Sequence, residues 1–370
     1  MYIKKVLLSN FRNYSHLSAE FFDGINVIEG KNAQGKTNLL EAIFFCCIGK
    51  SMRASREKEV IKFGEDTARV KIEVQKSYKT TEVYLLFSKL AKKTIKIDGI
   101  PIRRIGELLG ELNAVYFSPD ELRLIKDAPE DRRRFMDIHI SQTSKQYFYY
   151  LGRYEKILAN RNRLLKDVKD ISVLKETLPI WDTQLVDIGA KIVYMRVRFI
   201  ENLSPYAQKA HTYLTTNAES LELEYSGLSS DAKKKFTSLE NALSAIRDEL
   251  SKKLQKSIDK DIKLGYTTVG PHRDDIKISV NGIDIRAFGS QGQQRTVALS
   301  LKLAELEIIK EETGEMPILL LDDVLSELDA SRRDRLLKFC AKTQTFITGT
   351  DFPKDLPNAK YFQVKNATIN

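Results

Sequence analysis

Cysteine is scarce in this chain, and the few cysteines present are poorly placed for disulfides or metal sites. Only three occur among 370 residues, and two of them, Cys46 and Cys47, are adjacent within an apolar run. This arrangement favours packing in a core over a disulfide framework or a metal cluster. We therefore expect the reducing environment of the cytosol.

Long apolar segments are absent as well. The longest apolar stretches, such as Ala42–Ile48 and Pro317–Leu321, fall far below the roughly 20 residues that a bilayer-spanning helix needs. The first residues lead directly into a strand-like pattern, without the apolar core and cleavage site of a secretory signal. The sequence therefore predicts a cytoplasmic protein with no membrane-spanning segment and no membrane partner.

Basic residues exceed acidic ones, and apolar residues are plentiful. The chain has 60 Lys and Arg against 50 Asp and Glu, a net charge of +10 that favours a polyanionic partner. With 42% hydrophobic residues it can bury a sizeable core, and its length allows two or three domains. This composition is that of a globular protein.

Strand patterns occur near both ends of the chain, with helical spacing between them. Up to about Tyr116 the sequence is strand-rich, and Ile25–Glu29 reads as a short buried strand. Hairpins are predicted at Asp98-Gly99 and Asn281-Gly282, because these pairs adopt the positive φ angles of two-residue turns. From about residue 119 to residue 261 helical spacing dominates. We predict one helical domain inserted into an α/β domain.

A phosphate-binding pattern lies at Gly30–Thr37, which fits G-x-x-x-x-G-K-[ST] between an apolar strand and a helical pattern. Backbone amides at Gly30 and Gly35 can converge on phosphate oxygens. Lys36 supplies a cation for the β and γ phosphates, and Thr37 supplies a hydroxyl ligand for Mg²⁺. The alternative is a chance glycine turn before a helix, which the flanking patterns disfavour. We predict a site for ATP and Mg²⁺.

The other half of this site is predicted far along the chain. Pro317–Leu321 is a continuous apolar run, typical of a strand buried in a parallel sheet, and it ends in Asp322 and Asp323. Ligands bind at the carboxyl ends of such strands, so Asp322 can reach Mg²⁺ and Asp323 can polarise an attacking water. A solvated acidic turn is the alternative. Lys36 and Asp322 are 286 residues apart (322 − 36), which again indicates an insertion.

Two further segments flank the carboxylate strand. Ser290–Arg295 opens a helical pattern, with Ser290 as a candidate N-cap and Gly292 permitting close backbone approach. This segment lies about 30 residues before the strand, where ATP-binding-cassette (ABC) ATPases carry their signature motif. Ser326–Asp329, just after the strand, resembles their D-loop.

Together these motifs resemble the RecF family of bacterial recombination-repair proteins, relatives of the SMC ATPases. The segments that carry the resemblance are Asn10–Tyr14, Gly30–Thr37, Phe117–Leu122, Asp131–Asp137, Gly270–Asp275, Ser290–Arg295 and Asp322–Asp329. The resemblance implies an α/β fold: the ABC-type ATPase head of a P-loop NTPase, with an antiparallel β subdomain and an inserted helical lobe. Lobe I would comprise residues 1–116 and 262–370, and lobe II residues 117–261.

The resemblance also implies an ATP-dependent DNA-binding protein of recombinational repair and replication. Members of the family dimerise when ATP is bound, bind double-stranded DNA, and work with RecR and RecO to direct RecA loading at junctions of single- and double-stranded DNA. In that geometry Ser290 of one subunit touches the γ-phosphate held by Lys36 of the other. By the same analogy Arg12 and Asn13 lie near the nucleotide, and Arg53 reaches the phosphates or the DNA.

The candidate site residues fall into four groups. Catalysis is assigned to Asp323 and Lys36, and magnesium binding to Thr37 and Asp322. Nucleotide binding is assigned to the phosphate loop, its neighbours and the signature motif: Gly30, Lys31, Asn32, Ala33, Gln34, Gly35, Lys36, Thr37, Asn38, Arg12, Asn13, Ser290, Gly292 and Gln293. Candidate DNA contacts, for which a solvated or ion-paired role is the alternative, are Lys50, Arg53, Arg56, Arg132 and Arg133.

Two positions depart from the wider ABC pattern. Phe117–Glu121 offers no Gln at the lobe junction, and Thr348 stands where those proteins carry a His after the last strand. We therefore expect slow, DNA-stimulated ATP hydrolysis, which suits a switch better than a motor. The alternative function is the ATPase subunit of an ABC-type membrane transporter, which would be expected to carry both residues.

Overall fold

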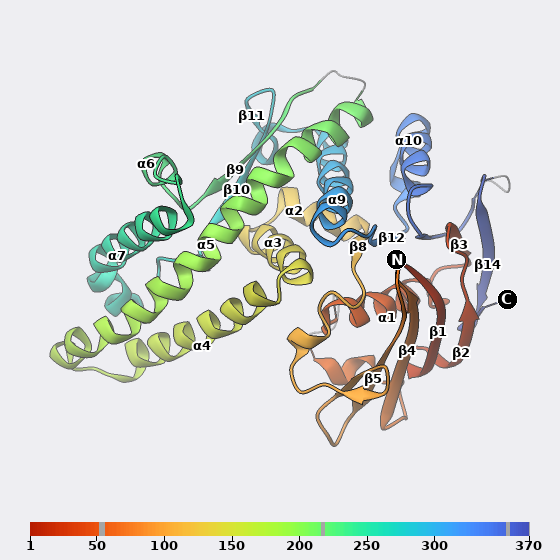
Figure 1. Ribbon diagram of the computed structural model, residues 1–370, viewed down its shortest axis with the longest axis horizontal. Coiled ribbons are helices and arrows are strands. Elements are labelled where there is room, and N and C mark those ends of the chain that lie inside the picture. Colours follow the sequence, from red (N-terminus) through yellow and green to blue (C-terminus); the bar gives the residue numbers. More distant parts are fainter. Residues whose placement is uncertain (52–55, 216–218, 353–355, 370) are drawn as a thin grey trace. The chain divides into compact units, whose positions relative to one another are not determined.

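The computed structural model describes residues 1–51, 56–215, 219–352 and 356–369, and contacts divide the chain into two compact units (Figure 1). The β-rich unit comprises Met1–Leu122, Tyr206–Glu219 and Gly292–Asn370, and the helical unit comprises Arg123–Pro205 and Ser220–Gln291. These boundaries differ from those of the predicted lobes at residues 117–122, 206–219 and 262–291. The insertion of a largely helical segment into an α/β unit is as predicted.

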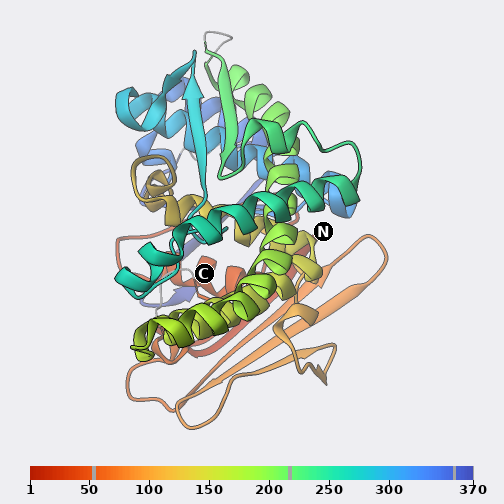
Figure 2. The same ribbon diagram turned by 90° about the vertical axis from the view of Figure 1, so that its left-hand side faces the viewer.

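An antiparallel sheet of six strands forms the first layer of the β-rich unit. In spatial order its strands are β2 (Tyr14–Glu20), β1 (Tyr2–Phe11), β4 (Thr67–Gln75), β5 (Thr80–Ser88), β6 (Thr94–Ile97) and β7 (Ile100–Pro101). Figure 2 shows β4 and β5 (orange) as long neighbouring strands. Asp98 and Gly99, with φ angles of 50° and 78°, form the predicted two-residue turn between β6 and β7.

A second sheet of six strands carries the candidate site. Its spatial order is β15 (Thr368–Ile369), β14 (Ala359–Lys365), β3 (Ile25–Glu29), β13 (Thr345–Gly349), β12 (Ile318–Asp322) and β8 (Ala114–Phe117). All pairs are parallel except β14 with β15, so the ends of β3 and β12 lie at one edge. All five residues of β12 are buried, which confirms the predicted strand.

Helices of the β-rich unit follow directly from the motifs. α1 (Lys36–Ile48) begins at Gly35, and α10 (Ala330–Cys340) begins after Asp329, whose carboxylate accepts from the amide of Arg332 at 2.9 Å. α9 (Gln291–Thr313) starts immediately after Ser290. Short 3-10 turns occur at η1 (Glu57–Val60), η2 (Ile105–Glu107), η3 (Pro119–Leu122) and η4 (Leu325–Glu327).

The helical unit has its own core. Its helices are α2 (Arg123–Lys126), α3 (Pro129–Thr143), α4 (Lys145–Asp167), most of α5 (Ile171–Thr215), α6 (Ser230–Lys233), α7 (Leu239–Leu264) and α8 (Ile285–Phe288). Leu165 of α4 packs with Leu174 and Leu178 of α5. A small sheet of β9 (Leu221–Ser226), β10 (Asp275–Val280) and β11 (Ile283–Asp284) includes the second predicted hairpin, with Asn281 and Gly282 at φ 51° and 77°.

Cys46 and Cys47 are buried in α1 and form no disulfide, so the prediction that they pack in a core is confirmed. Among the described residues, none of the helices combines the length and the apolar composition that a membrane crossing requires.

Candidate nucleotide-binding site

The phosphate loop follows β3 and turns into α1, as its motif requires. Ala33 and Gly35 have φ angles of 63° and 116°, in the left-handed region. A side chain at position 35 would be strained at this φ angle, and its Cβ would lie 2.9 Å from the side-chain amide of Asn13, so glycine is favoured there. The first turn of α1 thus begins beside a loop whose backbone amides can face an anion.

Lys36 is folded back onto its own loop. Its ammonium donates to the carbonyl oxygens of Gly30 at 2.5 Å and Lys31 at 3.0 Å. Burial lowers the pKa of Lys36, and the carboxylates of Asp323 and Asp322 partly oppose this shift. The lysine therefore lies within the field of both predicted acidic residues, and its carbonyl contacts can be exchanged for phosphate oxygens.

Asp322 at the end of β12 receives three hydroxyl groups. Thr37 donates to Oδ1 at 2.9 Å and Thr348 donates to the same oxygen at 2.7 Å, while Tyr116 donates to Oδ2 at 2.9 Å. The Thr37 contact joins the two motifs that lie 285 residues apart. A hydroxyl and a carboxylate are the oxygen ligands that Mg²⁺ prefers, so this pair fits the predicted metal site.

Asp323, the predicted catalytic carboxylate, follows the last residue of β12 in an unusual conformation. Its φ angle is 56°, and its amide donates to the hydroxyl of Thr348 at 3.0 Å. Thr348 therefore supports both acidic residues, one through a side chain and one through the backbone. Thr348, which stands where other ABC-type proteins carry a His, thus hydrogen-bonds both acidic residues through its hydroxyl group.

The turn between β1 and β2 supports the phosphate loop from one side. Asn13 donates to the carbonyl of Gln34 at 3.1 Å and accepts from the amide of Asn38 at 2.9 Å. The hydroxyl of Tyr14 donates to the carbonyl of Gly35 at 3.1 Å. Asn13 is thus placed directly against the loop, while Lys31 and Asn32 are exposed at its tip.

Arg12 is held by an ion pair on α1. Its guanidinium donates to both carboxylate oxygens of Glu41, at 2.9 and 2.7 Å, and to the carbonyl of Glu59 at 2.9 Å. Glu41 also accepts from Ser51 at 2.5 Å and is only 1% exposed. The structure thus gives Arg12 a defined partner beside the loop, which the sequence pattern did not reveal.

The signature segment is hydrogen-bonded to a partly buried glutamate, which in turn contacts a buried histidine. Gly292 and Gln293 lie in the first turn of α9, and the Gln293 amide donates to Glu219 at 2.7 Å. The other oxygen of Glu219 lies 3.1 Å from Nε2 of His211, whose Nδ1 lies 3.1 Å from the hydroxyl of Ser300. Burial lowers the pKa of His211, and Glu219 opposes that shift. His211 comes from α5 and Glu219 from the segment that follows it, so these contacts could not be inferred from spacing.

The candidate DNA contacts separate into different environments. Lys50 and Arg56 are exposed, and Arg53 lies outside the described residues. Arg132 is 2% exposed and forms a bidentate ion pair with Asp275 at 2.5 and 3.0 Å. Its guanidinium is enclosed in the helical unit, so the assignment of Arg132 as a DNA contact is corrected to a structural role.

Arg133 is also engaged within the helical unit. It donates to the carbonyl of Asp274 at 2.8 Å and is partly buried. Burial lowers the pKa of Arg133, and the neighbouring charge of Arg196 adds to the shift. The run of three arginines therefore contributes at least two side chains to the interior, as the ion-paired alternative for this run allowed.

Tyr116 was not identified from the sequence as part of the site. Its hydroxyl contacts Asp322, and burial raises its pKa, so the group keeps its proton and acts as a donor. The residue lies in β8, next to β12 in the sheet. Only the pairing of β8 with β12 reveals this contact between residues 206 positions apart. The place of Tyr116 just before the Phe117–Leu122 motif was a weak signal.

The profile of the RecF/RecN/SMC N terminal domain matches residues 2–351. "DNA replication and repair protein RecF" of Clostridium novyi (strain NT) is 42% identical over 374 residues, which cover 100% of each chain. This chain belongs to the RecF family.

Two solved structures are similar over the whole chain. One, described as "Structure of the recombination mediator protein RecF-ATPrS in RecFOR pathway", is 39% identical with a TM-score of 0.90, covering 100% of this chain and 97% of that chain. The other is "Structure of the recombination mediator protein RecF-ATP in RecFOR pathway". It is 40% identical with a TM-score of 0.88, covering 100% of this chain and 98% of that chain. These similarities confirm the predicted ABC-type head, and the transporter alternative gains no support from them.

Proposed function

We propose that this protein is an ATP-controlled DNA-binding protein of recombinational repair and replication. The contact between Thr37 and Asp322 carries the proposal, because it joins two distant motifs into one site for a magnesium–nucleotide complex. The names of the relatives, a DNA replication and repair protein and a recombination mediator of the RecFOR pathway, support the biological setting. RecO and RecR are accordingly the proposed partners, with RecA acting downstream.

Bound ATP would contact two copies of the chain and so hold them together as a dimer. Lys36 and the phosphate-loop amides hold the phosphates, and Thr37 with Asp322 holds Mg²⁺. The signature segment, from Ser290 to Gln293, then closes on the γ-phosphate bound by a second copy. ADP lacks that phosphate and would not close the dimer, so nucleotide state would set the oligomeric state.

Hydrolysis would end this state slowly. Asp323 is the group placed to polarise water, and the hydroxyl of Thr348 keeps its backbone in the observed turn. A threonine hydroxyl remains neutral and cannot exchange a proton near neutral pH as an imidazole can. A long-lived ATP state, released when DNA stimulates turnover, suits a clamp.

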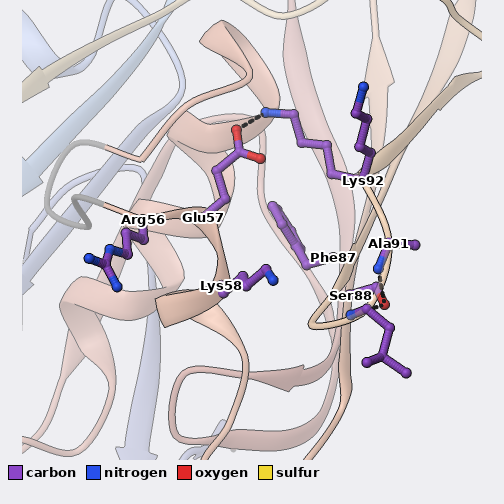
Figure 3. A pocket seen from close by; sticks show the side chains of 9 residues that line it. Arg56, Glu57, Lys58, Phe87, Ser88, Ala91 and Lys92 are labelled. Atoms are coloured by element: carbon purple, nitrogen blue, oxygen red, sulfur yellow. Dashed lines mark hydrogen bonds and ion pairs between the residues drawn. The ribbon is translucent and has the colours of Figure 1, made fainter.

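The proposed duplex DNA contacts include a basic cleft of about 620 Å³ in the β-rich unit. Figure 3 shows Arg56 just before η1, Lys58 within η1, and Lys92 on the turn between β5 and β6. Glu57 in the same cleft is paired with Lys93. The lining therefore carries an excess of positive charge toward the phosphate backbone of DNA, and binding should weaken steeply with salt.

Sedimentation with ATP, with ADP and without nucleotide tests the proposal. The wild type should be a dimer with ATP and a monomer in the other two states. Ser290→Arg should bind ATP normally but remain a monomer, because the added side chain obstructs the shared site. An ATP-saturated wild type that stays monomeric, or a Ser290→Arg variant that dimerises normally, would refute the shared-site model.

Measurements of DNA affinity test the proposed DNA binding separately from dimerisation. Duplex, single-strand and junction DNA should be compared with and without ATP, at two salt concentrations. Lys58→Ala with Lys92→Ala should weaken binding to every duplex and lower the salt dependence by about two charges. Equal binding of all three DNA forms, with no effect of ATP, would contradict an ATP-controlled DNA clamp.

A further inference from the structure

The last hairpin of the chain runs beside the strand that leads into the phosphate loop. β14 pairs in parallel with β3, with Tyr361 opposite Val27 and Gln363 opposite Glu29. β14 then continues past the end of β3 and turns at Asn366-Ala367 into β15. The turn therefore lies where the phosphate loop begins, although it comes more than 300 residues later in the sequence.

Two backbone amides of this turn bind one residue of the phosphate loop. The amide of Ala367 donates to the carbonyl of Gln34 at 3.1 Å, and the amide of Asn366 donates to Oε1 of the same residue at 2.6 Å. The carbonyl of Gln34 also accepts from Asn13. Gln34 is thus held between turns from opposite ends of the chain.

The geometry of the turn explains how both amides reach the loop. Asn366 and Ala367 have φ angles of 51° and 55°, and Lys365 pairs with Thr368 across them. Two successive residues with positive φ define a two-residue hairpin turn of type I′. Asn favours this conformation, whereas Ala occupies it at a steric cost.

Close packing fixes the hairpin against the loop. A Cβ on Gly30 would lie 2.5 Å from the carbonyl oxygen of Val364, so the first glycine of the phosphate motif is also required by β14. Val364 is 2% exposed, and the ring of Phe362 lies 5.1 Å from that of Phe21. The hairpin is therefore anchored independently of the two amide contacts.

We infer that the Asn366-Ala367 turn is a positioning element for the phosphate loop. By holding Gln34 from outside the site, it keeps the loop in its binding conformation before nucleotide arrives, which lowers the entropy lost on binding. The family profile ends at residue 351, so this element lies beyond the part of the chain that it matches. The inference rests on the proposed binding of ATP.

Two substitutions at one position provide the test. Ala367→Pro removes the amide donor and cannot adopt a positive φ, whereas Ala367→Gly keeps the donor and suits the turn. We expect Ala367→Pro to raise the Kd for both ATP and ADP about tenfold, since both nucleotides use the loop. Ala367→Gly should retain the wild-type Kd. Calorimetric titration measures the Kd, and thermal unfolding without nucleotide monitors the fold.

A second variant covers the case in which proline disturbs the hairpin itself. Two glycines inserted between Asn366 and Ala367 should move the amides away from Gln34 while leaving β14 in place, and they should raise the Kd to the same extent. A wild-type Kd in either folded variant overturns the inference. If neither variant shows a cooperative thermal unfolding transition, the inference is also overturned, because the turn would then be required for folding rather than for positioning the loop.

Failure of the proposed function would be visible separately. If the wild type bound no nucleotide, or bound it without forming a dimer, sedimentation of the unmodified chain would show this. Normal binding by the wild type together with an unchanged Kd in the folded Ala367→Pro variant would refute only the role of the turn.

Discussion

Two buried polar clusters, one in each unit, differ in the kind of partner they contain. In the β-rich unit the carboxylate of Asp322 is surrounded by three hydroxyl groups, all within 2.9 Å. In the helical unit the fully buried guanidinium of Arg161 lies 2.6 Å from Asp182 and 2.8 Å from Asp261. One charge has neutral partners, and the other has two charged ones.

This difference indicates what each cluster can do. Neutral hydroxyls solvate the Asp322 carboxylate without cancelling its charge, so the group can still accept a cation. Breaking a buried ion pair leaves an uncompensated charge and costs several kcal/mol, so the Arg161 cluster is fixed. A buried polar group with exchangeable neutral partners is therefore a candidate site, whereas one with charged partners holds the fold together.

The largest effect on nucleotide affinity is expected at Lys36. Lys36→Ala removes the cation but leaves Asp322 with its hydroxyls, so nucleotide affinity should fall at least about 100-fold. The unfolding midpoint without nucleotide should stay close to that of the wild type. Calorimetry with ATP and thermal unfolding measure the two quantities. A variant that keeps its ATP affinity would contradict the assigned role of the lysine.

The opposite pattern is expected at Arg161. Arg161→Leu leaves Asp182 and Asp261 buried without their cation, so the free energy of unfolding should fall by about 3–5 kcal/mol. ATP affinity of the folded protein should not change. Arg163→Leu is the matched control on the same helix, because Arg163 is exposed and its pair with Asp167 contributes about 0.5 kcal/mol or less. Denaturant titration of both variants decides whether the predicted contrast exists.

The sequence predicted the site better where its residues adjoin a motif than where strands bring them together. The phosphate loop, the strand ending in Asp322 and both two-residue turns are encoded locally, by glycine positions and apolar runs. Tyr116 and the turn at Asn366-Ala367 reach the site only through strand pairing, which local patterns do not contain.

The arginine-rich segment shows a second limit of sequence reasoning. Arg132 and Arg133 have the composition of a DNA contact, but the carboxylate that pairs with Arg132 and the carbonyl that accepts from Arg133 lie 143 and 141 residues away. A charge run has no periodicity that distinguishes solvent from interior. The strand Leu221–Ser226 lies in a stretch, about residues 217–238, that lacks clean periodicity, so the sequence left the structure of this stretch open.

A smaller effect, one that depends on pH, is expected at Asp274, a buried carboxyl outside both clusters. Burial raises the pKa of Asp274 in the helical unit to about 6, with the hydroxyl of Tyr225 and the charges of Arg196, Lys253 and Arg133 opposing the shift. The folded state therefore favours the protonated acid. Its stabilising contribution is fully present below the unfolded pKa of about 3.9 and is lost as the pH rises through 6.

Asp274→Asn should remove this dependence. Between pH 4 and pH 6.5 the unfolding free energy of the wild type should fall relative to that of the variant by up to about 3 kcal/mol. The amide oxygen can still accept from Tyr225, so the variant should fold. Urea titrations at several pH values provide the measurement, and parallel curves for the two proteins would show that Asp274 does not titrate in this range.

The smallest effect is expected at Tyr116, whose hydroxyl donates to Asp322. Tyr116→Phe removes one neutral donor from Oδ2, so the free energy of unfolding should fall by about 1 kcal/mol, and magnesium-dependent ATP affinity should fall about threefold as the carboxylate loses its orientation. Tyr154→Phe is the control, because Tyr154 contributes a buried hydroxyl at 2.8 Å from His272 in the helical unit. It should lower stability similarly without changing the magnesium dependence. If both variants lose stability but neither alters the magnesium dependence of ATP affinity, the hydroxyls around Asp322 only support the fold. The claim that the Asp322 cluster is a binding site and the Arg161 cluster a structural one would then be contradicted.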